Sequence, residues 1–149
     1  MREDIKSLDV YTESLVFSNL IWRTCAEWDY FARKTLGVQL VRAADSISAN
    51  IAEGYGRFHY KEDLNFCYYA RGSFEEVKDW IRKAEIRKLI PEEHKNQIDH
   101  FMSQFLPKLN SYINYIKKQI NKKDIQQETP PAASTSLTNS TTSTTSTKS

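Results

Sequence analysis

Apolar residues recur at intervals of three and four along most of the first 120 residues, which is the spacing of one face of an α-helix. The pattern predicts four helices, over residues 9–28, 36–53, 61–89 and 91–120. The first has the widest apolar stripe, so we expect it to pack on more than one side. No segment alternates apolar and polar residues for long enough to predict a strand.

Single residues add detail to these boundaries. Glu62 and Asp63 fall in the first turn of the third helix, where carboxylates suit the helix dipole. Pro91 suits the first position of the fourth helix, whereas Pro107 lies inside it and should kink or split it. Short connections between long helices favour antiparallel neighbours. We therefore predict an all-α fold, an antiparallel up-down four-helix bundle, over residues 1–120.

The composition changes sharply near residue 121. Beyond Pro130 and Pro131 the chain is mostly Ser and Thr, and such a segment buries too little apolar surface to offset its ordering entropy. We predict that residues 121–149 form a disordered tail. It is either a plain flexible tail or one that is modified or binds a partner.

The composition as a whole fits an ordinary cytoplasmic protein. The 149 residues carry a formal charge of only +2, which says little about partners. No run of about eighteen apolar residues is present, so we expect no membrane span. The first residues lack the apolar stretch of a signal peptide. Cys25 and Cys67 are isolated among apolar residues, which predicts reduced, buried thiols.

The stretch SISANIAEGYGR, residues 46–57, holds two of the four glycines. A dinucleotide-binding fingerprint needs a third glycine and a preceding strand, and a P-loop needs Gly-Lys-Ser/Thr; both are missing. Acidic residues at the start of the next helix would also repel a phosphate there. We interpret Gly54 as a left-handed stop of the second helix and Gly56 as the residue that allows a tight turn.

A row of short polar side chains precedes and includes this stretch. Its members lie three or four residues apart on one helical face: Gln39, Arg42, Ser46, Asn50, Glu53 and Arg57. A solvated face would more often carry long Lys and Glu side chains. The row therefore predicts a subunit interface or a lined channel, and the alternative is a solvated stripe. Glu53 should form a structural ion pair with Arg42 or Arg71.

Three runs in the chain resemble one known family. They are LVRAADSISANIAEGYGR (residues 40–57), KEDLNF (61–66) and YARGSFEEV (69–77). They resemble the bacterial four-helix bundle proteins that are encoded by intervening sequences in 23S rRNA genes. The similarity spans most of residues 8–90, whereas the loop FHYKED, Pro107 and the Ser/Thr-rich tail depart from the pattern.

The resemblance implies a four-helix bundle that assembles into a homo-oligomeric ring, a pentamer. Arg71 also matches the motif, and we group it with the polar row as part of an expected assembly or partner surface. A distantly similar bundle, the accessory protein of diversity-generating retroelements, partners a reverse transcriptase and binds nucleic acid. By that analogy, RNA or DNA and a reverse transcriptase or another protein are the partners we expect.

Two groups of basic residues are candidate nucleic-acid contacts. They are Lys78, Arg82 and Lys83 on the third helix, and Lys117, Lys118, Lys122 and Lys123 near the end of the fourth. Acidic residues interleave with the first group, which is typical of a solvated face with ion pairs at i,i+4. The lysines of the second group have fewer acidic neighbours, so they are the better electrostatic candidates.

The sequence offers little for catalysis. His59, His94 and His100 are scattered, and no motif of a hydrolase, a metalloprotease or a redox centre occurs. We expect no enzyme activity, no cofactor and no metal site. Two functions stay open: an accessory bundle associated with nucleic acid or a nucleic-acid enzyme, and a structural protein–protein interaction module without nucleic-acid affinity.

Overall fold

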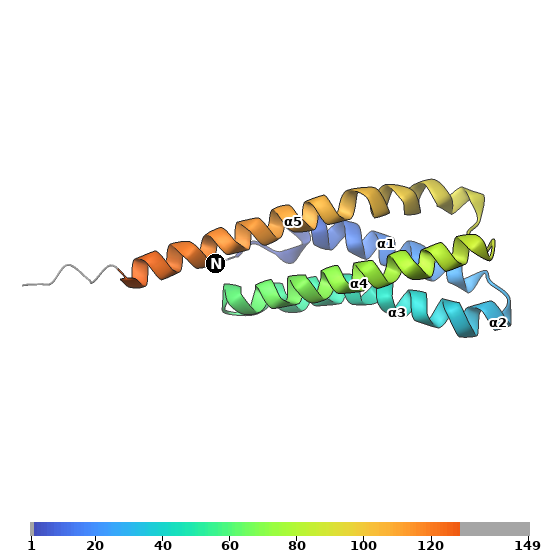
Figure 1. Cartoon of the computed structure of the whole chain (residues 1–149), viewed down its shortest axis with the longest axis horizontal. Coiled ribbons are helices and arrows are strands. Elements are labelled where there is room, and N and C mark those ends of the chain that lie inside the picture. The colour runs from blue at the N-terminus through green and yellow to red at the C-terminus, as the bar shows by residue number, and fades with distance from the viewer. Residues whose placement is uncertain (1, 129–149) are drawn as a thin grey trace, which may run out of the picture.

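The computed structural model describes residues 2–128 as a bundle of four long helices (Figure 1). Three single turns precede or link them. The elements are η1 (Ile5–Ser7), α1 (Asp9–Ala26), α2 (Tyr30–Ala32), the π-turn η2 (Arg33–Gly37), α3 (Val38–Tyr55), α4 (Tyr60–Ile86) and α5 (Glu92–Glu128). These residues include no strand, so the predicted all-α four-helix fold is confirmed.

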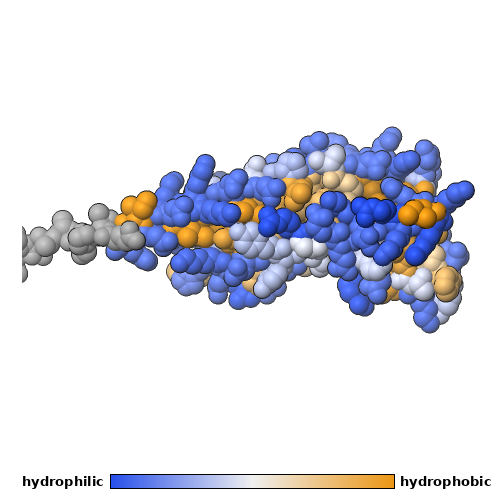
Figure 2. Space-filling model, in the orientation of Figure 1, coloured by the Kyte–Doolittle hydropathy of each residue, from blue (hydrophilic) through white to orange (hydrophobic). Residues whose placement is uncertain are grey.

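Each long helix packs against two others, α1 and α4 each against both α3 and α5. The amphipathic stripes meet along the axis, where each helix contributes a fully buried large side chain: Phe17, Ile47, Phe74 and Phe105. Phe101 stacks on Phe17 with ring centroids 3.9 Å apart. The viewed surface is largely hydrophilic, with hydrophobic residues showing in an interrupted band along the long axis (Figure 2).

The second helical run begins earlier than the sequence pattern predicts. The carboxylate of Asp29 accepts a hydrogen bond from the backbone N–H of Ala32, which caps the helix at that point. The chain then passes through the π-turn η2 directly into α3, so one helical run spans residues 30–55 instead of 36–53. The apolar periodicity missed the first turn because Tyr30 and Phe31 point into solvent.

Pro107 does not split α5, so that part of the prediction was wrong. The proline ring is exposed, and the carbonyl of Ser103, which loses its helical partner, also lies on an exposed residue where water can solvate it. α5 continues to Glu128 and runs past the end of the α3–α4 pair (Figure 1). The boundary expected at residue 120 therefore falls inside this helix, and residues 129–149 lie outside the described residues.

Gly54 is not a left-handed stop, because no described glycine has a positive φ. It lies inside the last turn of α3 and is buried. A Cβ added there would lie 2.7 Å from the Oδ1 of Asp63 and 2.7 Å from the Cβ of Phe66. Gly54 is therefore needed because the backbone of α3 approaches α4 too closely for any side chain. Gly56, which caps α3, has an ordinary φ of −76°.

We predict that Gly54→Ala destabilises the bundle. The new methyl group would force α3 and α4 apart at Asp63, and overpacking of this kind costs about 1–3 kcal/mol. Urea unfolding followed by circular dichroism measures the change in the free energy of unfolding.

Gly72→Ala is the matched control. Gly72 lies inside α4, and a Cβ added there would meet no atom within 4 Å. Alanine should stabilise this exposed helical position by about 0.5–1 kcal/mol. If both substitutions changed stability in the same direction and by the same amount, the close approach at Gly54 would be refuted.

Candidate functional site

The polar row on α3 is held largely by bonds within the protein. The hydroxyl groups of Ser46 and Ser73 lie 2.7 Å apart and join α3 to α4, while Asn50 donates to the carbonyl of Ser46 at 2.8 Å. Glu53 pairs with Arg57, with the Arg57 Nη2 and Glu53 Oε1 atoms 2.9 Å apart. The prediction that Glu53 pairs with Arg42 or Arg71 was wrong, since Arg57 lies one helical turn away and reaches it first.

The first two residues of the row point outward, and Arg71, which was grouped with the row, lies on α4. Gln39 and Arg42 are exposed, and among the described residues neither has a hydrogen-bond partner. Arg71 is half-buried on α4, with its guanidinium over the ring of Tyr68 at 4.9 Å from the centroid. The row therefore forms one helical face with two environments. Its middle is bonded to α4, and its first residues face solvent.

Arg42 borders an apolar groove between α1 and α3. The groove has a volume of about 450 Å³, and Trp22, Val38 and Val41 contribute its large apolar side chains. Trp22 is 62% exposed, although tryptophan is a costly residue to leave in water. Arg33, Arg42 and Asp45 supply charge around this apolar centre. An apolar centre with a charged rim is the arrangement found in protein–protein interfaces.

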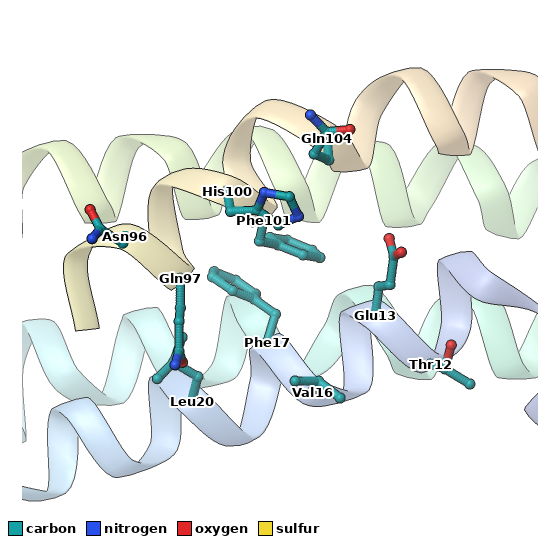
Figure 3. A pocket seen from close by; sticks show the side chains of 10 residues that line it. All are labelled: Thr12, Glu13, Val16, Phe17, Leu20, Asn96, Gln97, His100, Phe101 and Gln104. Carbon is teal, nitrogen blue, oxygen red and sulfur yellow. The ribbon is translucent and has the colours of Figure 1, made fainter. Parts of the chain in front are cut away.

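A second hollow, of about 570 Å³, lies between α1 and α5 (Figure 3). The stacked rings of Phe17 and Phe101 face each other at its centre, and polar side chains from both helices surround them. Glu13 at this site is ion-paired with Lys108. The nearby His100 comes from α5 and has no nucleophile bonded to it among the described residues. The hollow is therefore described better as an apolar surface than as a catalytic site.

Asp63 is the centre of a buried network that sequence reasoning missed. Its carboxylate is fully buried, and its Oδ2 accepts hydrogen bonds from Arg2 Nη1 at 2.8 Å and from the Tyr112 hydroxyl at 3.0 Å. Burial raises the pKa of Tyr112, and the charge of Asp63 adds to this shift. Burial alone would lower the pKa of Arg2, but the hydrogen bond and charge of Asp63 outweigh it and raise that pKa.

The two cysteines are free and buried, as predicted. Burial raises the pKa of each thiol to about 12, and Asp63 adds to the shift at Cys67. A thiol with such a pKa is protonated at neutral pH and is a poor nucleophile or metal ligand. Within residues 2–128 no group of three or more His, Cys, Asp or Glu side chains is placed to hold a metal ion.

The basic residues of α4 lie beside carboxylates of the same helix. Lys78 pairs with Glu75 at 3.1 Å, while Arg82 and Lys83 both pair with Asp79, at 3.4 and 2.6 Å. The hydrogen bonds and charges of Lys83 and Arg82 lower the pKa of Asp79, and the bond from Lys83 contributes most. The group therefore has the form of a solvated, charge-balanced helix face.

The lysines of α5 are placed differently. Lys117, Lys118 and Lys122 are exposed and have no carboxylate partner among the described residues. Lys123 turns toward the bundle, with its Nζ 5.0 Å from the centre of the Tyr60 ring. Tyr115, which is 51% exposed, precedes Lys118 and Lys122 by three and seven residues, so the three side chains share one outer face of α5.

One family model matches residues 6–111, and its description is 23S rRNA-intervening sequence protein. The match includes the polar row, Gly54 and Asp63, but it ends before Tyr115 and the lysines of α5. No curated protein matches the chain significantly. Among the described helices, none combines the length and apolar character that a bilayer crossing requires.

Proposed function

The chain belongs to the 23S rRNA-intervening sequence protein family, and on this premise we propose that it is a non-enzymatic, homo-oligomeric bundle that accompanies nucleic acid or a nucleic-acid enzyme. RNA or DNA would be the direct partner. A reverse transcriptase or another protein would be the enzyme that the bundle assists. The two buried, free thiols fit the reducing environment of the cytoplasm, which is the location we propose.

The face of α5 that carries Tyr115, Lys118 and Lys122 is the observation that supports nucleic-acid binding best. The ammonium groups are exposed and free of carboxylates among the described residues, so they can replace the counterions of phosphates. The exposed ring of Tyr115 lies on the same face, where an unpaired base can stack on it. Beyond this face α5 extends past the end of the α3–α4 pair (Figure 1).

The groove between α1 and α3 supports homo-oligomer formation. A second copy of the chain would cover Trp22 and Val38, and its own carboxylates would meet Arg42 at the rim. The resemblance to the family implies a ring, and we propose a pentamer. In a ring the face of α5 would be repeated around an axis, so a modest charge on each subunit would produce a stronger combined field.

The absence of enzyme activity is part of the proposal. The buried thiols are poor nucleophiles, and the three histidines lie in separate places. His94 is hydrogen-bonded to Thr24, whereas His59 lies against Phe58 in the loop before α4. The alternative function is a structural interaction module that uses the same groove but has no nucleic-acid affinity.

We predict that Lys118→Ala with Lys122→Ala weakens binding of fluorescent single-stranded RNA and DNA. For single strands, the slope of log affinity against log salt should fall by about 0.7 for each phosphate that the protein no longer neutralises. Fluorescence polarisation at three salt concentrations measures both the affinity and the slope.

The double substitution Arg82→Ala with Lys83→Ala is the matched control, because it removes the same charge from two side chains that are ion-paired with Asp79. It should change the slope much less. If the wild-type chain bound neither RNA nor DNA at low salt, the interaction module would be the better account. An equal effect of the two double substitutions would refute the assignment to α5.

A separate prediction concerns assembly. Trp22→Ala should shift the mass measured by light scattering toward the monomer, because a buried interface tryptophan contributes about 2 kcal/mol or more. Arg42→Glu, at the rim of the groove, should act in the same direction, and circular dichroism should show unchanged helical content for both.

Phe58→Ala provides the comparison for removal of an exposed aromatic ring. Phe58 is 86% exposed in the loop before α4, away from the groove. Its removal should leave the mass unchanged. An unchanged mass for Trp22→Ala and Arg42→Glu would show that the groove is ordinary solvated surface and not a subunit interface.

A further inference from the structure

Arg2 lies in the segment before α1, and its side chain occupies a pocket whose walls are formed by the helices. The walls come from three helices: Tyr55 of α3, Tyr60 and Asp63 of α4, and Tyr112 of α5. The guanidinium carbon of Arg2 lies 5.1 Å from the centre of the Tyr55 ring and 4.3 Å from that of Tyr60. The arm before α1, residues 2–8, contributes the cation, whereas the ring faces and the carboxylate around that cation all come from the helices.

The chemistry of this pocket is selective for a guanidinium group. Two aromatic faces lie on the cation, which is the arrangement of a cation–π site. The Nη1 atom of Arg2 donates to Asp63 Oδ2 at 2.8 Å and to the carbonyl of Tyr55 at 3.1 Å. Both bonds come from this one nitrogen, and a planar guanidinium group can make them while its faces lie on the two rings. An ammonium group can also donate twice, but it is more strongly hydrated and has no planar face to stack.

The carboxylate of Asp63 makes an occupant necessary. Its side chain has an exposure of 0%, so water does not solvate the charge, and the Tyr112 hydroxyl bonded to it is neutral. A buried charge with no cation is costly, so an empty pocket is unfavourable. A competing cation that enters the pocket would therefore be bound favourably. The side chain of Arg2 itself is 26% exposed, so the pocket opens to the surface.

A second aromatic–carboxylate arrangement in the chain shows what distinguishes this pocket. Arg57 lies over the ring of Phe66 at 4.9 Å and pairs with Glu53 at 2.9 Å. Both charged side chains there are substantially exposed, at 42% and 54%. Water satisfies Glu53 when Arg57 leaves, so that arrangement needs no cation and selects none.

The pocket adjoins a surface hollow of about 450 Å³ that reaches Leu8 and Tyr115. Residues of the arm line part of this hollow, and the hydroxyl of Tyr55 donates to the carbonyl of Glu3 there. We propose that Tyr55, Tyr60, Asp63 and Tyr112 form a guanidinium-binding site, which Arg2 fills in cis and an arginine side chain of a protein partner fills when the arm is displaced. The proposal does not rest on nucleic-acid binding by α5, although Tyr115 lines the same hollow and Lys123 lies on the Tyr60 ring.

The test uses the full-length chain with Arg2→Ala and a fluorescent peptide of sequence MREDIKSL as the source of arginine in trans. Fluorescence polarisation should show saturable binding to Arg2→Ala that is at least tenfold tighter than binding to the wild-type chain, whose own arm competes. The peptide with alanine in place of its arginine should not bind. Adding Asp63→Asn to Arg2→Ala should weaken binding at least tenfold.

A small-molecule probe separates the guanidinium group from the rest of the peptide. Ethylguanidinium at millimolar concentration should raise the melting temperature of Arg2→Ala by several degrees, while ethylammonium should raise it less. Arg57→Ala is the control, because Arg2 still fills the pocket in this variant. Each probe should shift its melting temperature by no more than it shifts that of the wild-type chain. Arg2→Gln serves in the same experiments if Arg2→Ala does not fold.

The proposal is overturned if the arginine and alanine peptides bind Arg2→Ala equally, or if Asp63→Asn leaves binding unchanged. It is also overturned if the wild-type chain and Arg2→Ala bind the peptide with the same affinity, because the arm would then not occupy the site. Failure of both Arg2→Ala and Arg2→Gln to bind either probe while folded would have the same consequence.

Discussion

The buried carboxylate of Asp63 is the constraint on which one end of the bundle depends. A buried charge that loses its partner destabilises a protein by about 3–5 kcal/mol, so Asp63 requires a cation and hydrogen-bond donors. Arg2 supplies the cation from the arm before α1, and Tyr112 supplies a hydroxyl donor from α5. Gly54 leaves the space in which the carboxylate lies. The arm, α3, α4 and α5 are thereby joined at one residue.

Different interactions stabilise the two halves of the bundle. Toward the α1–α5 hollow, stacked phenyl rings such as Phe17 and Phe101 fill most of the core. Around Asp63, tyrosines replace phenylalanines because their hydroxyl groups and ring faces satisfy charge as well as volume. The surfaces proposed for partners follow this division: the α5 face with Tyr115 adjoins the polar end, and the apolar groove with Trp22 lies between α1 and α3.

Much of the fold could be predicted because four long amphipathic stripes determine it. The row on α3 was found as a helical face, but its partners were not, since pairing of Ser46 with Ser73 depends on how α3 and α4 meet. Gly54 was misread because sequence alone cannot separate a left-handed stop from a close approach. Asp63 was interpreted only as a first-turn carboxylate, because its partner Arg2 lies 61 residues away and no local pattern links them.

A double-mutant cycle between Arg2 and Asp63 tests the central claim most directly. The free energy of unfolding in urea would be measured for the wild-type chain, Arg2→Ala, Asp63→Asn and the double variant. We expect a coupling energy of about 1–3 kcal/mol, with the double variant less destabilised than the sum of the single ones, because Asp63→Asn removes the charge that Arg2 neutralises. Additivity within about 0.5 kcal/mol would contradict the account.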